Sequence, residues 1–81
     1  MLVKVLYFAA ARDLASKKTE TISVREGAAV KDLAIELAKV HPGLKKLENS
    51  VRFSINSEVV DGSSPLREGD VVGVLPPVAG G

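Results

Sequence analysis

Alternation of polar and apolar residues marks two strands near the start of the chain. Residues 2–9 are rich in β-branched and aromatic side chains, and residues 20–25 alternate polar with apolar positions. Such segments are typical of β-strands, the first central in a sheet and the second nearer an edge. The segment 13–19 between them is polar and predicts a hairpin loop. The chain is therefore expected to begin with a β-hairpin.

The period of the pattern changes at residue 30 to that of an amphipathic helix. Apolar residues recur at intervals of three and four, at Val30, Leu33, Ala34, Leu37 and Ala38. This spacing places them on one face, which can pack on a core. Pro42 disfavours helical geometry at His41, so the helix is expected to end there. Ala28 and Ala29 are poor N-caps, so its start is marked less clearly.

The second half of the chain contains the strand with the clearest alternation. Residues 51–56 place Val51, Phe53 and Ile55 on one face and polar side chains on the other. Asn56 and Ser57 suit a tight turn into a short edge strand at 58–60. After a loop at 62–65 and a Gly-Asp turn at 69–70, residues 71–75 form a last strand that is too apolar for a sheet edge.

The order of these elements defines the expected fold. The first and last strands are the most apolar, so we expect them to pair centrally and in parallel, with the helix across one face. This is an α+β fold of the β-grasp type, with a mixed sheet of four to five strands and one main helix. A chain of 81 residues supports one hydrophobic core. We therefore expect one β-grasp domain over residues 1–75 and an extended, flexible tail over 76–81.

Composition narrows the classes of function. Lys and Arg number 11 and Asp and Glu number 10, and this balance argues against binding to nucleic acid or to an anionic membrane. There is no cysteine, which excludes disulfides and thiolate metal sites. The apolar run at 2–11 is interrupted by Lys4 and is too short to span a bilayer. We expect a cytoplasmic protein without a signal peptide or membrane helix.

The C-terminal segment suggests a chemical role for a backbone group. Two prolines favour an extended conformation, and small residues leave little to obstruct a narrow channel. The segment consists of Pro76, Pro77, Val78, Ala79, Gly80 and Gly81. Such a tail can thread into the active site of a partner, where ATP converts the carboxylate of Gly81 into an acyl-adenylate. The acyl group then accepts sulfur or is transferred to an amine. The alternative is a frayed terminus.

A resemblance to a known family favours a reactive tail over a frayed terminus. The sequence resembles the small, sulfur-carrying subunit of molybdopterin synthase, which is related to the thiamine-pathway sulfur carrier and to ubiquitin-like modifiers. The matching residues are Phe8, Ala9, Arg12, Asp13, Asn56, Pro65, Leu66, Gly69, Asp70, Val71 and the six residues 76–81. There are two departures: Gly73 stands where the family usually has alanine, and Leu75 where an aromatic residue is common.

The resemblance implies a set of partners and a reaction. An adenylyltransferase of the ubiquitin-activating type would charge Gly81 with AMP, using ATP, and a sulfur donor protein would convert the adenylate to a thiocarboxylate. The tail would then deliver sulfur to a pterin precursor in the large subunit of molybdopterin synthase. No cofactor is implied for this chain itself. Two alternatives remain open: a protein modifier conjugated through Gly81, and a carrier for thiamine or another sulfur metabolite.

Strand parity predicts where partners dock. If Lys4 faces solvent, Leu6 and Phe8 face outward with it, and Leu75 lies on the same face. With Val59 or Val60 these side chains would form an apolar patch beside the start of the tail, unless loops cover them. The predicted docking residues are Phe8, Arg12, Val59 and Leu75. Arg12 is equally well explained as a solvated loop residue.

The other polar residues do not suggest an internal active site. His41, the only histidine, lies at the predicted helix end, where an imidazole commonly interacts with free carbonyl groups. Asp13, Asp61 and Asp70 are separate loop or turn residues, so we predict no metal site, and Asp70 is interpreted as part of the turn after Gly69. The isolated chain is therefore expected to have no catalytic activity on small molecules.

Overall fold

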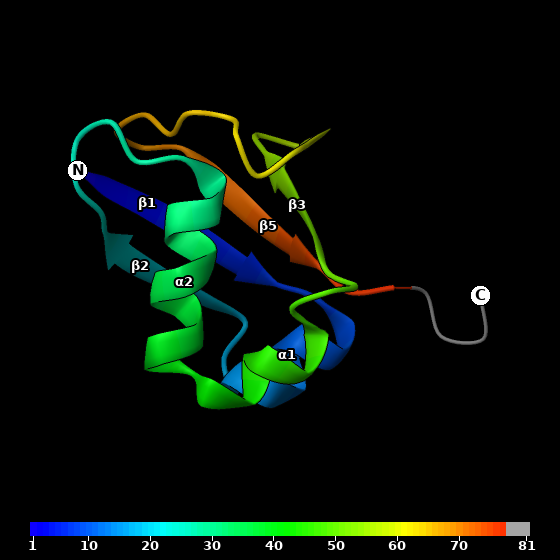
Figure 1. The fold of residues 1–81 in the computed structure, drawn as a ribbon. Helices are drawn as coiled ribbons and strands as arrows, with labels where there is room; N and C mark the ends of the chain where they lie inside the picture. The colour runs from blue at the N-terminus through cyan, green and yellow to red at the C-terminus, as the bar shows by residue number, and fades with distance from the viewer. Residues whose placement is uncertain (78–81) are drawn as a thin grey trace.

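A mixed sheet forms the framework of the protein in the computed structural model, which describes residues 1–77. Within these residues the elements are β1 (Leu2–Tyr7), α1 (Ala9–Ala15), β2 (Thr19–Ser23), α2 (Val30–Val40), the 3₁₀ helix η1 (Pro42–Leu47), β3 (Arg52–Ile55), β4 (Glu58–Val60) and β5 (Val71–Leu75). The strand order is β2-β1-β5-β3-β4, with β1 and β5 parallel and the other neighbours antiparallel. Helix α2 crosses one face of the sheet (Figure 1). The expected β-grasp fold is confirmed.

The core lies between the two central strands and α2. Val5 pairs with Val72, and Tyr7 with Val74, so inward side chains of β1 and β5 lie side by side. Leu33 and Leu37 of α2 pack against them and are at most 2% exposed. Full burial of a side chain of this size contributes about 1.5–3 kcal/mol. The alternation predicted for the first and last strands is therefore confirmed, with the inward residues forming the core.

A loop replaces the missing side-chain cap at the start of α2. The backbone N–H of Val30 donates to the carbonyl of Ser64 at 3.0 Å, and that of Lys31 to the carbonyl of Gly62 at 2.9 Å. The Asp32 carboxylate accepts the N–H of Ala29 at 2.8 Å. These contacts satisfy N–H groups that the first turn of a helix leaves without partners. Helix α2 consequently begins at Val30 although its N-cap residue is an alanine.

The predicted first hairpin is wrong in one respect, because a helix interrupts it. Strand β1 ends at Tyr7 instead of Ala9, and α1 takes the last residue of the expected strand and the first three residues of the expected loop. Alanine has the highest helix propensity, and the buried Ala11 and Ala15 lie one turn apart on the inner face. Arg12 therefore lies on a helix and not in a loop. The 3₁₀ helix η1 was also not predicted, whereas the end of α2 just before His41 was.

The predicted turn at Asn56 and Ser57 joins β3 to β4. Both residues have positive φ angles, +48° and +76°, as a two-residue hairpin turn requires. The Asn56 amide also donates to the Asp70 carboxylate at 3.1 Å and accepts the N–H of Val71 at 3.0 Å. Asp70 accepts the N–H of Arg67, which confirms its predicted role in the turn. This network connects the hairpin to the start of β5.

Candidate functional site

An apolar depression lies on the face of the sheet opposite α2. Its apolar side chains come from three strands and from the junction between β1 and α1. The residues that line it are Leu6, Phe8, Ser54, Ser57, Val59, Val71, Gly73 and Leu75, around a volume of about 230 Å³. We call it the outward depression. The structure thus brings together three of the four predicted docking residues, Phe8, Val59 and Leu75, of which Phe8 is 40% and Val59 62% exposed.

The backbone around Phe8 directs its ring onto the outward face. Its N–H donates to the carbonyl of Val74 at 3.3 Å, which continues the alignment of β1 with β5. The next residue, Ala9, has a φ of +48°, a conformation that is unfavourable for alanine, and the chain turns there into α1. The Phe8 carbonyl accepts the N–H of Ala11 at 3.0 Å in the first turn of the helix. This turn leaves the Phe8 ring beside Gly73 of β5.

Gly73 provides the space in which the Phe8 ring lies. A Cβ atom at this position would be 2.4 Å from Ser54 Oγ and 3.3 Å from Phe8 Cε2. The Ser54 hydroxyl thus occupies the place that an alanine methyl group would need. This contact explains why glycine stands where the family that the sequence resembles usually has alanine.

Replacement of Gly73 by alanine should therefore destabilise the protein through overpacking, by about 1–3 kcal/mol. The measurement is denaturant unfolding of Gly73→Ala, Ser54→Ala and the double variant. Because the hydroxyl causes the closer contact, the double variant should recover part of the loss. Equal losses in Gly73→Ala and the double variant would show that the Ser54 contact is not responsible.

The remaining predicted site residues lie outside the outward depression. Strand β5 ends at Leu75, and Pro76 and Pro77 follow it without regular secondary structure. Val78, Ala79, Gly80 and Gly81 lie outside the described residues, so their predicted roles stay predictions. Arg12 is exposed on α1, and within residues 1–77 its side chain has no hydrogen-bond or ion-pair partner. Because Leu75 both lines the depression and ends β5, the depression adjoins the start of the tail.

Residues 1–77 contain neither a cluster of metal-ligating side chains nor a helix that could span a membrane. No group of three or more His, Asp or Glu side chains lies close enough together to hold a metal ion. In the same part of the chain, every helix is too short or too polar to cross a membrane.

Three side chains form a polar cluster that the sequence did not reveal. The Tyr7 hydroxyl donates to Glu20 Oε2 at 2.6 Å, and His41 Nε2 lies 2.5 Å from the same oxygen. The rings of Tyr7 and His41 meet edge to face, with centroids 5.7 Å apart. The side chains of Glu20 and His41 are 10% and 13% exposed. Lys17 Nζ lies 3.6 Å from Glu20 Oε1. His41 therefore contacts a carboxylate, and the expectation that its ring would interact with free carbonyl groups is wrong.

The cluster changes the acidity of its members. Burial raises the pKa of Glu20, but the hydrogen bonds from Tyr7 and His41 and the charges of His41 and Lys17 outweigh it. The net pKa of Glu20 lies below its ordinary value of 4.5. Burial, followed by the hydrogen bond to Glu20 and the charge of Glu20, raises the pKa of the Tyr7 phenol. The phenol therefore stays protonated and acts as a donor. The cluster joins β1, β2 and the end of α2.

Loss of the Glu20 charge should destabilise the protein in a pH-dependent way. A carboxyl group with a lowered pKa stabilises the fold above its unfolded pKa, and this contribution is lost as pH falls through the lower folded value. Glu20→Gln should lower the free energy of unfolding by about 1–3 kcal/mol near neutral pH and by progressively less in acid. Denaturant unfolding from neutral pH to below 4.5 measures this difference, with Glu26→Gln at an exposed turn as control. A cost for Glu20→Gln that is unchanged in acid would contradict the assignment.

The arrangement of these features defines a class of protein. A helix across a mixed sheet with parallel central strands, and an apolar outward face beside the C-terminal segment, make the chain a ubiquitin-like β-grasp protein. The chain belongs to the ThiS family, which matches residues 5–81.

Relatives with similar sequences carry a consistent name. Molybdopterin synthase sulfur carrier subunits from Homo sapiens and Chlamydomonas reinhardtii are 37% and 35% identical to the chain. The human alignment covers 98% of this chain and 93% of the relative, and the algal alignment covers all of both. The similarity therefore extends over essentially the whole chain.

Solved structures show the same fold. A putative molybdopterin converting factor, subunit 1, from Pyrococcus furiosus is 40% identical, with a TM-score of 0.87 over 96% of this chain and 99% of that one. One chain of a protein–protein complex of subunits 1 and 2 of molybdopterin-converting factor from Helicobacter pylori is 29% identical over both full chains, with a TM-score of 0.75. The small archaeal modifier protein 1 from Methanosarcina acetivorans is 30% identical, with a TM-score of 0.81 over 99% and 96% of the two chains.

Proposed function

We propose that this protein is a sulfur carrier in molybdopterin biosynthesis and the small subunit of a molybdopterin synthase. The observation that carries the proposal is the end-to-end similarity to sulfur carrier subunits of that enzyme. The terminal Gly-Gly sequence supplies a carboxylate that such a carrier needs, without a bulky side chain near it. The absence of cysteine excludes a thiol of the chain itself as the sulfur-carrying group. The sulfur would therefore reside on the carboxyl group of Gly81, in the cytoplasm.

The proposed chemistry has three steps, each performed in a partner. In an adenylyltransferase of the ubiquitin-activating type, a carboxylate oxygen of Gly81 attacks the α-phosphate of ATP and pyrophosphate leaves. Hydrosulfide supplied by a donor protein then attacks the acyl carbon, and AMP leaves with the former carboxylate oxygen. In the large subunit the sulfur of the resulting thiocarboxylate forms a bond to a pterin precursor of the molybdenum or tungsten cofactor. Water then cleaves the acyl–sulfur bond, which leaves the sulfur on the pterin and regenerates the Gly81 carboxylate. This chain contributes the reacting group and the surfaces that position it.

The outward depression is suited to bind these partners. Phe8, Val59 and Leu75 present apolar surface, and the reacting glycine is the sixth residue after Leu75. Six extended residues reach about 20 Å, enough to enter a buried active site while the depression stays in contact with the rim. The Helicobacter pylori complex of subunits 1 and 2 supports a two-subunit assembly. The depression would bind the large subunit and the adenylyltransferase in turn.

Protein modification through Gly81 is the second candidate function. Its support is the similarity to the small archaeal modifier protein 1 from Methanosarcina acetivorans. Activation by adenylation is common to both functions, so the terminus does not distinguish them. A carrier for thiamine or another sulfur metabolite would also use the same tail.

Reconstitution with purified components tests the proposal. The chain is incubated with ATP, a molybdopterin synthase adenylyltransferase and a sulfur donor, and is then mixed with the large subunit and a pterin precursor. We expect ATP-dependent exchange of one terminal oxygen for sulfur, followed by formation of the dithiolene product. Sulfur loading without product in the presence of an active large subunit would favour another acceptor. Transfer of the adenylated chain to lysines instead would favour the modifier.

A further inference from the structure

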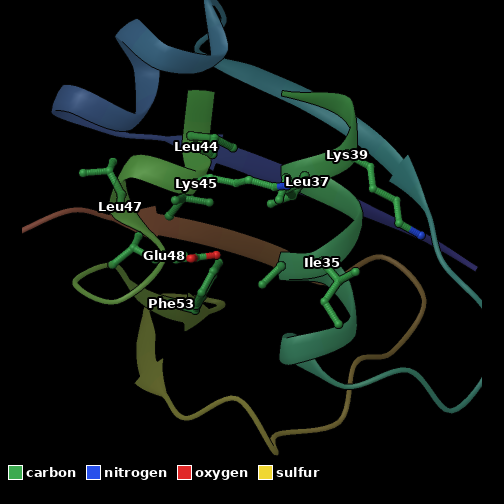
Figure 2. Close-up of a pocket in the computed structure, with 12 residues that line it drawn as sticks. Ile35, Leu37, Lys39, Leu44, Lys45, Leu47, Glu48 and Phe53 are labelled. Carbon is green, nitrogen blue, oxygen red and sulfur yellow. The ribbon is translucent and has the colours of Figure 1, made fainter. Parts of the chain in front are cut away.

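A second apolar cavity lies on the face of the sheet that α2 covers. It has a volume of about 360 Å³ and is walled by α2, η1 and the inner faces of β3 and β5. Its apolar side chains include Ile35 and Leu37 of α2, Leu44 and Leu47 of η1, and Phe53 of β3. Figure 2 shows these side chains around the opening between α2 and η1. The cavity shares none of its lining residues with the outward depression.

The dimensions of the sheet explain why this space is open. Five strands about 4.8 Å apart span about 19 Å, whereas a helix is about 10 Å in diameter. Helix α2 therefore covers about half of the inner face, and η1 packs against α1 and α2 (Figure 1). A shallower depression continues along the uncovered part and shares Ala34, Ile35, Val51 and Phe53 with the cavity. The two form one groove that follows α2 from Val30 to Lys39, about 14 Å at 1.5 Å per residue.

The groove exposes apolar surface and has a basic rim. Ile35, which lines both parts, is 56% exposed. Four of the six charged lining residues are basic, namely Lys31, Lys39, Lys45 and Arg52 against Glu48 and Asp61. Lys39 Nζ forms an ion pair with Glu36 Oε1 at 3.5 Å. Figure 2 shows the Lys39 side chain pointing away from the cavity. Lys45 extends from η1 toward α2 and forms no ion pair within residues 1–77.

We infer that this groove binds an acidic amphipathic helix of a partner protein, which lies beside α2 and completes the helical layer over β3. A groove of this length accommodates two to three helical turns, with apolar residues at i, i+3, i+4 and i+7 entering between Ile35 and Phe53. Acidic residues flanking that stripe would meet Lys31 and Lys45. A second copy of this chain fits poorly, because α2 itself carries equal numbers of acidic and basic residues.

The inferred site acts separately from the tail. Phe8 and Leu75 lie on the opposite face of the sheet from the cavity, and the groove meets the outward depression only at Val59 of the edge strand β4. A helix bound over the cavity therefore leaves Phe8 and Leu75 free. A partner at the groove could hold the protein while the tail occupies the active site of another enzyme. The inference does not depend on which acceptor receives the acyl or sulfur group of Gly81.

The test is an NMR titration of the full, isotope-labelled chain with a capped amphipathic peptide. The peptide carries leucines at the four helical positions and glutamates beside them, and a control peptide has lysine in place of each glutamate. We expect saturable shifts at Ile35, Lys45 and Phe53, weaker binding in higher salt, and little binding of the lysine peptide. Absence of saturable binding, equal binding of both peptides, or shifts confined to the outward depression would overturn the inference.

Matched variants separate the groove from the general surface. Ile35→Ser and Lys45→Glu should each lower the affinity for the glutamate peptide at least about five-fold. Val40→Ser and Lys46→Glu, at positions on the same elements that do not line the groove, should change affinity less than about two-fold. All four positions are at the surface, so the variants should stay folded. If sedimentation instead shows a dimer that Ile35→Ser dissociates, the groove binds a second copy and the inference is wrong.

Discussion

Removal of Gly81 is expected to abolish sulfur transfer completely while leaving the melting temperature unchanged. The reaction requires an activated carboxyl group at a position that the adenylyltransferase active site can reach, and deletion withdraws that group by one residue. Stability should not change, because β5 ends at Leu75 and the core is built from residues before it. The measurements are product formation with the large subunit and thermal unfolding of the same preparation.

Two further variants show whether position or composition of the terminus matters. Addition of one alanine after Gly81 retains every native residue but displaces the carboxylate, and should be as damaging as the deletion. Val78→Ala leaves the Gly-Gly terminus in place and should retain most of the activity. A large fall in melting temperature on deletion would show that the terminus is structural, and normal activity would show that Gly81 does not carry the sulfur.

Substitution of Phe8 or Leu75 by aspartate is expected to weaken binding to both the adenylyltransferase and the large subunit by about 2 kcal/mol or more, roughly 30-fold. Each substitution places a charge in the outward depression, where an apolar partner surface would have to desolvate it. The effect on stability should be smaller, because Phe8 is 40% exposed and neither residue belongs to the buried core. Titration calorimetry with each partner, on variants shown to be folded, measures the loss.

The control is the same charge elsewhere on the same face. Thr21 of β2 pairs with the outward-facing Lys4 and lies toward the opposite edge of the sheet from Val59. Thr21→Asp should leave both affinities unchanged within about two-fold. Unchanged affinity of a folded Phe8→Asp or Leu75→Asp variant would eliminate the depression as the docking surface. Parallel testing of Arg12→Ala would decide whether that exposed residue takes part in either complex.

The central architecture was predictable because its patterns are long and have a definite period. The spacing of Val30, Leu33 and Leu37 identified α2, and the apolar content of residues 2–7 and 71–75 identified the two central strands. Alternation from Lys4 assigned the outward face correctly. Helix α1 was missed because Phe8 and three alanines continue the apolar run of β1, so no change of period marks the boundary at Ala9. An alanine run with helix propensity was the available signal.

The candidate site was predictable where it depends on strand parity and not where it depends on distant side chains. Phe8, Val59 and Leu75 converge because adjacent strands place residues of one parity on one face. The contacts among Tyr7, Glu20 and His41 join three elements, and neither hydrophobic period nor motif spacing encodes such a contact. The groove beside α2 likewise depends on the width of the whole sheet relative to one helix, which appears only once the strand order is known.

The intact mass of the protein isolated from its own cells tests the central claim most directly. The proposal predicts a fraction of chains heavier by the difference between one sulfur and one oxygen atom, with fragmentation placing the change on Gly81. Treatment that hydrolyses thiocarboxylates should remove this difference. Chains found only with an unmodified carboxyl group, or joined through Gly81 to lysines of other proteins without any sulfur-containing form, would contradict the proposal that the protein is a sulfur carrier.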